Sequence, residues 1–120
     1  RQAENFAKKG KAVILDATFV TKKLRNIAAE IAAKNIIPFF ILQTQCSEEK
    51  SISRILKRTK ENYVSNALTK EAYIANQKNF EPVNLNRLKK NYPKLEITHL
   101  KVDTEFDDPE NWYIILKIVK

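Results

Sequence analysis

Glycine is nearly absent from this sequence: Gly10 is the only one among 120 residues. Loops that wrap a phosphate group are built from several glycines, because only glycine lets the backbone come so close to the ligand. The chain therefore contains no loop of the form G-x-x-x-x-G-K-[ST]. Any chemistry that depends on such a loop must receive it from outside these 120 residues.

Cysteine and histidine occur once each, as Cys46 and His99. A single cysteine cannot form an internal disulfide, which is typical of a protein in a reducing cytoplasm. With one histidine, a histidine-based zinc site or a serine–histidine triad has little to be built from. We expect Cys46 to be a small buried residue and His99 to be an ordinary strand residue.

Long apolar runs are also missing, so the sequence predicts no membrane span, and its polar N-terminus does not resemble a signal peptide. The 43% of hydrophobic residues suffice for one packed domain over residues 1–120. Basic residues exceed acidic ones by a net charge of +8. This excess favours a polyanionic partner, either nucleic acid or a phosphate-bearing small molecule.

The first strong structural signal is the apolar run at 12–15, which ends on Asp16 and Thr18. Its β-branched residues predict a strand over 12–17 that is buried on both faces, as in a parallel sheet. Ligands of such sheets bind beyond the carboxyl ends of the strands, which makes Asp16 and Thr18 candidate site residues. A strand that simply ends on a turn-forming aspartate remains the alternative.

Two further apolar runs predict strands at about 38–45 and 95–102. The second of these ends, like the first strand, on a carboxylate and a hydroxyl, Asp103 and Thr104. The pattern predicts that both pairs of polar residues lie at the same edge of the sheet.

Helical periodicity and capping residues predict six helices. They lie at about 1–9, 21–35, 48–59, 69–80, 84–91 and 109–119. The helix after Thr21 is expected to bury one apolar stripe, composed of Leu24, Ile27, Ala28, Ile31 and Ala32. The last helix, with Asp108 as cap and Pro109 at its first position, is expected to bury Trp112, Ile115, Leu116 and Val119. This order of elements predicts a three-layer α/β fold with a mostly parallel sheet of three strands.

Three arginines complete the candidate residues. Arg54 and Arg58 are four residues apart on one face of a predicted helix, where two guanidinium groups can grip one polyphosphate. A solvated basic face is the alternative for this pair. Arg25 lies one turn into the helix that follows the first strand, placed to reach back toward Thr18. Asp16 is suited to hold the hydration shell of Mg²⁺.

Several short motifs, spread in order along nearly the whole chain, are similar to those of one known family. Val13-Ile14-Leu15-Asp16-Ala17-Thr18-Phe19, followed by Arg25, resembles the Walker B region of the predicted kinases of the P-loop superfamily. These are AAA-type domains related to gluconate kinase, polynucleotide kinase and zeta toxin. The resemblance continues through Cys46-Ser47-Glu48-Glu49, and Arg54 and Arg58 match the lid arginines of that family. It is completed by Ser65-Asn66-Ala67, Gln77, Phe80-Glu81-Pro82 and Val102-Asp103-Thr104.

The resemblance implies an incomplete P-loop NTPase fold, ATP and Mg²⁺ as cofactors, and phosphoryl transfer to the hydroxyl of a small molecule or of a nucleic-acid end. By this resemblance, Asp16 serves the metal or the acceptor hydroxyl, and Arg54 and Arg58 neutralise charge on the phosphoryl group. The resemblance also implies two sets of binding residues. They are Thr18 and Arg25 for the acceptor, and Arg54, Arg58, Asp103 and Thr104 for the nucleotide. Asn66 stands where many relatives carry an aspartate, so its role stays open.

The chain departs from the family in lacking the Walker A loop, which in the family precedes the strand of Asp16. We therefore expect this chain to be the C-terminal part of a kinase domain that is inactive by itself. A non-catalytic nucleic-acid-binding domain and a scaffold domain remain the alternatives.

In the family, the strand that carries the loop lies between the counterparts of 12–17 and 38–44. Without it, we expect these two strands either to pair directly or to have the gap filled by the missing segment or a second copy.

Overall fold

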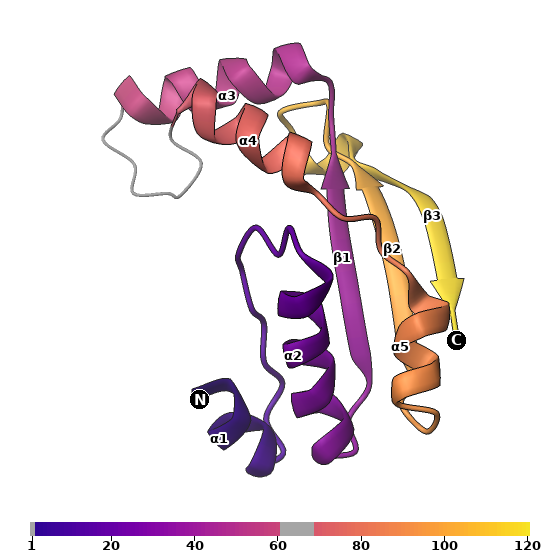
Figure 1. Cartoon of the computed structure of the whole chain (residues 1–120). Coiled ribbons are helices and arrows are strands. Elements are labelled where there is room, and N and C mark those ends of the chain that lie inside the picture. The colour runs from indigo at the N-terminus through magenta and orange to yellow at the C-terminus, as the bar shows by residue number, and fades with distance from the viewer. Residues whose placement is uncertain (1, 61–68) are drawn as a thin grey trace.

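The computed structural model describes residues 2–60 and 69–120 (Figure 1). Their elements are, in chain order, α1 (Gln2–Lys8), α2 (Lys22–Lys34), β1 (Phe39–Gln45), α3 (Glu48–Lys60), α4 (Lys70–Asn79), α5 (Leu85–Asn91), β2 (Ile97–Asp103), the 3₁₀ turn η1 (Pro109–Asn111) and β3 (Tyr113–Val119). The helices predicted within residues 1–91 are confirmed to within a few residues of their ends. Side-chain caps begin four of them, since Thr21, Ser47, Thr69 and Asn84 each accept the N–H of the residue three positions later.

The sheet has the order β1-β2-β3. β1 and β2 run parallel, with Phe39 opposite Ile97, whereas β2 and β3 run antiparallel. The register of the second pair shifts between Lys101 and Val102. The sheet is therefore mixed, and the expectation of a mostly parallel sheet holds only for β1 and β2.

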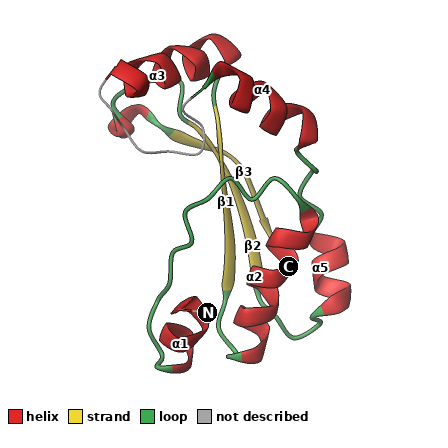
Figure 2. Cartoon of the chain, turned by 60° about the vertical axis from the view of Figure 1, so that its left-hand side comes forward, coloured by secondary structure: helices red, strands yellow, loops and turns green. Residues whose placement is uncertain are grey.

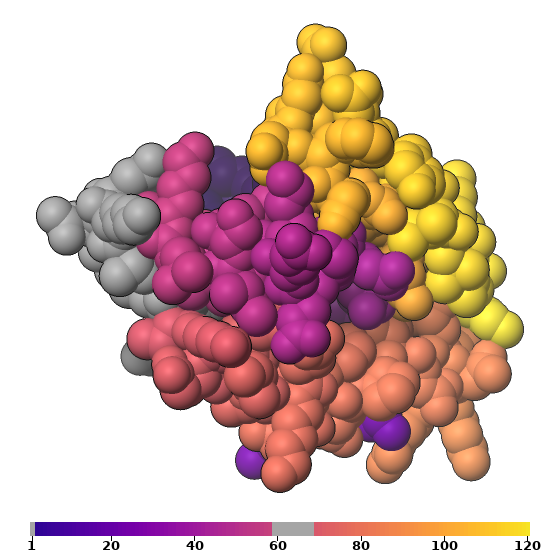
Figure 3. All heavy atoms as spheres, turned by 90° about the horizontal axis from the view of Figure 1, so that it is seen from above, coloured from indigo at the N-terminus to yellow at the C-terminus, as the bar shows by residue number. Residues whose placement is uncertain are grey.

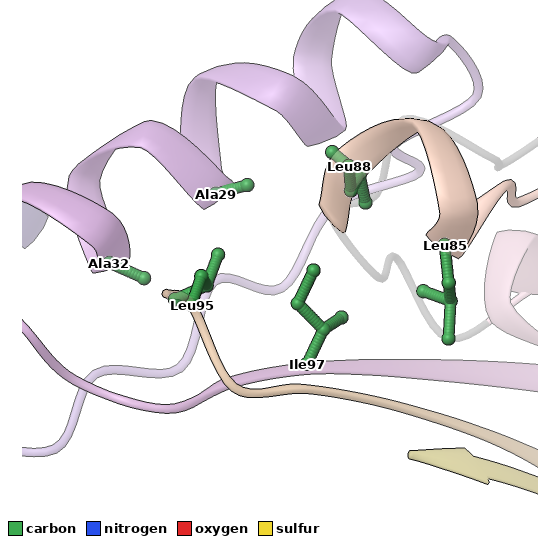
Figure 4. Close-up of a cluster of buried hydrophobic side chains, with 6 residues drawn as sticks. All are labelled: Ala29, Ala32, Leu85, Leu88, Leu95 and Ile97. Carbon is green, nitrogen blue, oxygen red and sulfur yellow. The ribbon is translucent and has the colours of Figure 1, made fainter. Parts of the chain in front are cut away.

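The core lies between the sheet and two helices, α2 and α5 (Figure 4). Ile97 of β2 is fully buried at its centre. Its buried neighbours are Ala29, Ala32, Leu85, Leu88 and Leu95. The two alanines let α2 approach the sheet closely. Burial of a side chain as large as Ile97 contributes about 1.5–3 kcal/mol, so this small cluster fixes α2 and α5 on one face of the sheet.

The apolar stripe predicted for α2 is only partly correct. Ala32 is buried, but Leu24 and Ile27 are 44% and 47% exposed, and the other buried residues of the helix are Arg25 and Ala29. The helix is thus rotated from the orientation that its periodicity predicts. The reason is that Arg25 takes a buried position, which a pattern of apolar residues cannot reveal.

The strand predicted at 12–17 is wrong, because this segment is an irregular loop that lies apart from the strands of the sheet (Figure 2). Ile14 is 93% exposed. A strand requires a neighbour to bind its N–H and C=O groups, and this segment pairs with no strand among the described residues. We expected segments 12–17 and 38–44 either to pair directly or to have the gap between them filled by another segment. Direct pairing of these two segments is not observed.

The helix predicted at 109–119 is also wrong. Only the turn at its start is helical, where Asp108 caps η1 and Pro109 begins it. Residues 113–119 form β3 instead. Their isoleucines and valine favour a strand, and the free edge of β2 offers hydrogen-bonding partners that a helix would leave unpaired.

The expected three-layer arrangement is not found in the described residues. Phe40 and Leu42 point to the sheet face opposite α2 and α5, and they are 63% and 64% exposed. The radius of gyration is 15.8 Å, against about 14 Å for a compact domain of this length. The fold is a small, open α/β arrangement, with α3 and α4 placed beyond the carboxyl ends of β1 and β2 (Figure 1).

His99, the only histidine, lies in β2 on the core face of the sheet and is 5% exposed. Its Nε2 atom is 3.0 Å from Oε1 of Gln43 on the neighbouring strand. Burial lowers the pKa of His99, and the positive charges of Lys101 and Arg25 lower it further. The folded chain therefore holds this imidazole neutral where an unfolded chain would protonate it.

We expect the chain to lose stability as the pH falls below about 6.5, the pKa of histidine in an unfolded chain. The loss arises because the unfolded state binds a proton there that the folded state binds only at a lower pH. Urea denaturation of the chain and of His99→Gln, at pH 7.5 and pH 5.5, measures the effect. The variant keeps a hydrogen-bond donor for Gln43 but does not titrate. An equal loss of stability in both proteins would contradict this origin.

Candidate functional site

A groove of about 1230 Å³ separates the loop at 13–20 from β1. α2 and α4 contribute to its walls. The groove brings together four of the predicted site residues, Asp16, Thr18, Arg25 and Thr104. Arg54, Arg58 and Asp103 do not line it. Four of the seven predicted site residues therefore line one groove, and the other three lie outside it.

Asp16 and Thr18 belong to the irregular loop and are exposed. Within the described residues, Asp16 has no hydrogen-bond or ion-pair partner. Because its carboxylate is unpaired and faces an open groove, it is available to a cation or to a hydroxyl group.

Arg25 is buried, with 5% of its surface exposed, and its guanidinium group binds backbone carbonyls. Nη1 donates to Phe19 O at 3.1 Å, and Nη2 donates to Glu81 O and to Pro82 O. The ring of Phe80 lies 5.3 Å from the guanidinium carbon. Arg25 thus ties the loop that carries Thr18 to the segment after α4.

The charge of Arg25 is partly balanced by Glu81. Burial lowers the pKa of Arg25, and the carboxylate of Glu81 opposes this shift. Phe19, which accepts from Arg25, has a φ of 42° in the left-handed region. A non-glycine residue is strained there, so the contact with Arg25 holds the loop in a shape that it would not adopt freely.

Arg54 is held by the loop that follows β2. Its Nη2 atom donates to the carbonyls of Thr104 at 2.5 Å, Phe106 at 3.2 Å and Glu105 at 3.3 Å, and it lies 3.4 Å from Oδ1 of Asp107. Nη1 lies 3.7 Å from the sulfur of Cys46. The guanidinium group of Arg54 therefore joins α3 to this loop.

The same loop is attached to α3 by two further contacts. The carboxylate of Glu105 accepts from the backbone N–H and the hydroxyl of Ser47, the residue before α3. Lys50 lies 3.5 Å from Asp107. Lys50 and Arg54 lower the pKa of Asp107. Seen along the sheet from this end, α3, α4 and the loop form one continuous surface (Figure 3).

Arg58 differs from Arg54 in that it is exposed and has no hydrogen-bond partner within the described ranges. The two lid arginines predicted together thus occupy different environments. Arg58 is free to meet a ligand, whereas Arg54 already binds the loop.

Asp103 and Thr104 both have partners at the end of β2. Oδ1 of Asp103 accepts the N–H of Glu105 at 2.9 Å, and Thr104 donates its N–H to Gln45 O at 2.8 Å. The hydroxyl of Thr104 also donates to that carbonyl. The two bonds of Thr104 join the carboxyl ends of β1 and β2, and the bond of Asp103 shapes the turn after β2.

The described residues do not provide a complete site for ATP and Mg²⁺. They contain no group of three or more metal-ligating side chains. One carboxylate such as Asp16 suits Mg²⁺ only when phosphate oxygens supply further ligands. The phosphates themselves find no glycine-rich cradle, because the chain has a single glycine. The residues present therefore do not fit the nucleotide by themselves.

Comparison with known families tests which family these residues belong to. A family model described as an AAA domain matches residues 1–83. The chain belongs to this AAA domain family. Comparisons with curated proteins and with solved structures gave no match. The prediction of a P-loop AAA-type domain, a class that binds nucleotides, is confirmed at this level.

The match to the AAA domain family includes Asp16, Arg25, Arg54 and Arg58 but ends before β2. The roles of Asp103 and Thr104 thus rest on the sequence resemblance alone. The motif 65–67, with Asn66, lies outside the described residues. In its described part, the AAA domain has no helix that is both long and apolar enough to cross a membrane.

Sequence analysis of the AAA domain missed the attachment of the loop after β2 to α3, which depends on Glu105 and Asp107. One signal was present: acidic residues are concentrated at 103–108, and basic residues recur along α3. Such complementary charges indicate contact only after the fold has brought the two segments together.

We expect Arg54→Ala to lower the free energy of unfolding by about 1.5–3 kcal/mol, the scale for hydrogen bonds that involve a charged group. Arg58→Ala, on the same helix, removes no contact with a described residue. This variant should change the free energy of unfolding by about 0.5 kcal/mol or less. Urea denaturation measures both. Arg54→Lys should restore stability only in part, because an ammonium group cannot span several carbonyls as a planar guanidinium does. Equal effects of the two alanine variants would contradict the assignment.

Proposed function

We propose that this chain is the part of an ATP-dependent kinase domain that works together with a Walker A segment supplied from outside residues 1–120. The complete domain would transfer a phosphoryl group to the hydroxyl of a small molecule or of a nucleic-acid end. The observation that carries the proposal is the open groove of an AAA-type domain that exposes the unpaired carboxylate of Asp16 beside the free edge of β1.

The free edge of β1 supports a place for the Walker A strand in this groove. Among the described residues, β1 pairs with β2 alone, so one row of its N–H and C=O groups faces the groove. Apolar side chains border it, among them Leu15 at 47% exposure and Phe40 at 63%. An extended segment placed here would pair with β1 and cover this apolar surface. A second copy of the chain is the other occupant that could supply such a segment.

The roles that we assign within the kinase follow from the surroundings of each residue. Asp16 would act on Mg²⁺ or on the acceptor hydroxyl, because it is unpaired in the groove. Arg58 would meet the nucleotide phosphates, because it is free. Arg54 would position the loop that begins at Thr104, and Arg25 would position the loop that carries Thr18. Both of these arginines already bind backbone carbonyls.

The first test is whether the encoding frame upstream of Arg1 contains a strand followed by a Walker A loop. A frame without that loop would favour a scaffold domain or a nucleic-acid-binding domain.

We expect the 120-residue chain to show no ATP hydrolysis above background, since it has no loop to hold the phosphates. The domain extended by its Walker A segment should be active, and Asp16→Asn in it should remove most Mg²⁺-dependent turnover while nucleotide binding persists. Turnover and nucleotide affinity are measured on the same preparations. Near-normal turnover of Asp16→Asn would remove Asp16 from the mechanism, and tight ATP binding by the 120-residue chain would overturn the proposal.

In the extended domain, Arg58→Ala should lower kcat about 10²-fold, the scale for the loss of one group that stabilises transition-state charge. Its melting temperature should stay unchanged. Lys57→Ala is the matched control, since it removes a neighbouring positive charge from the same helix. An equal loss in both variants would show that only the general charge of α3 matters.

A further inference from the structure

A second hollow, of about 400 Å³, lies between the start of α2 and α5. It shares only the buried Arg25 with the groove. We call this second hollow the basic cleft, because most of the other polar residues that line it carry a positive charge or a side-chain amide. These polar residues are Lys22, Lys23, Asn26, Glu81, Asn84, Arg87 and Asn91.

The charges of the basic cleft do not cancel. Glu81 is the one acidic residue among the described residues that line the cleft. It interacts with the charge of Arg25, and its Oε1 atom also accepts the N–H of Lys22 at 3.2 Å. Glu81 and Arg25 therefore offset one another. The side chains of Lys22, Lys23 and Arg87 are left without an ion pair to any described residue. By contrast, ion pairs with carboxylates engage Lys8, Lys34, Lys50 and Arg54 elsewhere in the chain.

The positions of Lys22 and Lys23 are unfavourable for the helix that carries them. They stand in the first turn of α2, a helix of 13 residues that has no acidic residue in that turn. The helix dipole places positive charge there, so two lysines cost stability at this end. Residues that are unfavourable for their helix and make no compensating contact are expected where a function requires them.

We propose that the basic cleft binds the phosphodiester backbone of nucleic acid. Three unpaired cations and the side-chain amides of Asn26, Asn84 and Asn91 are donors suited to phosphate oxygens. Lys22, Lys23 and Arg87 come from two different helices, and three unpaired cations suit a ligand that carries several phosphate groups. The ligand is therefore a chain of phosphates, and the net charge of +8 acts in the same direction. This site does not depend on the kinase proposal.

The test measures the binding of fluorescently labelled 20-nucleotide DNA and RNA, single-stranded and duplex, to the 120-residue chain by anisotropy at several salt concentrations. The cleft variant combines Lys22→Gln, Lys23→Gln and Arg87→Gln. The control variant removes the same number of charges elsewhere, through Lys9→Gln, Lys78→Gln and Lys117→Gln. All six side chains have no ion pair to a described residue, and circular dichroism checks that both variants fold. The double variant Lys23→Gln/Arg87→Gln replaces the triple variant if the latter is unfolded.

We expect the chain to bind at least one of these oligonucleotides, and the cleft variant to bind it about tenfold or more weakly. The slope of log affinity against log salt should fall by about 2 to 3, because up to three phosphate contacts are lost. The control variant should lose less than about threefold. Equal losses in the two variants would overturn the proposal, as would undetectable binding by the unaltered chain. A competition experiment compares inorganic phosphate, a free nucleotide and an unlabelled oligonucleotide at the same total concentration of phosphate groups. If inorganic phosphate or the free nucleotide competes as strongly as the oligonucleotide, the proposal is also overturned.

Discussion

The buried guanidinium group of Arg25 is the contact on which the arrangement of this chain depends. It binds carbonyls from two segments that are far apart in the sequence, the loop before α2 and the segment after α4. A cation at this depth must have its donors satisfied, because an unpaired buried charge costs several kcal/mol. The same side chain lines both the groove and the basic cleft. Its guanidinium group already donates to backbone carbonyls, so Arg25 is a structural residue of both candidate sites.

The loop after β2 is organised by a second arginine in a similar way. Arg54 gathers three consecutive carbonyls and the carboxylate of Asp107, and Glu105 binds Ser47 at the start of α3. These bonds join the last strands to a helix that belongs to the matched family segment. Arg25 and Arg54, to which the sequence resemblance assigns ligand-binding roles, both bind backbone carbonyls in this chain.

The features that the sequence predicted well depend on local signals. The helices α2, α3, α4 and α5 begin at residues whose side chains cap them, and such caps can be recognised within four positions of the chain. The strands β1 and β2 are apolar enough to be recognised without their context. Asp16, Thr18 and Thr104 line one groove, although Asp16 and Thr18 reach it from a loop and not from the end of a parallel strand.

The features that were predicted poorly from the sequence depend on partners that are distant along the chain. Val13 and Leu15 have the composition of a buried strand, but a strand exists only where a neighbour pairs with it. Residues 113–119 have both a helical start and β-branched residues, and the free edge of β2 decides between them. The burial of Arg25 cannot be read from apolar periodicity, since its partners are carbonyls that every residue carries. The distinction between Arg54 and Arg58 depends on a loop about 50 residues away.

The parallel pairing of β1 with β2 has a consequence for the order in which the chain forms during synthesis. Phe39 pairs with Ile97, and α3, α4 and α5 lie between them in the sequence. While the ribosome makes this intervening stretch, the edge of β1 that pairs with β2 has no partner. The nascent chain therefore exposes an apolar strand for several seconds at ordinary elongation rates of about 5–20 residues per second. A chaperone that binds extended apolar segments would find its target in β1 during that interval.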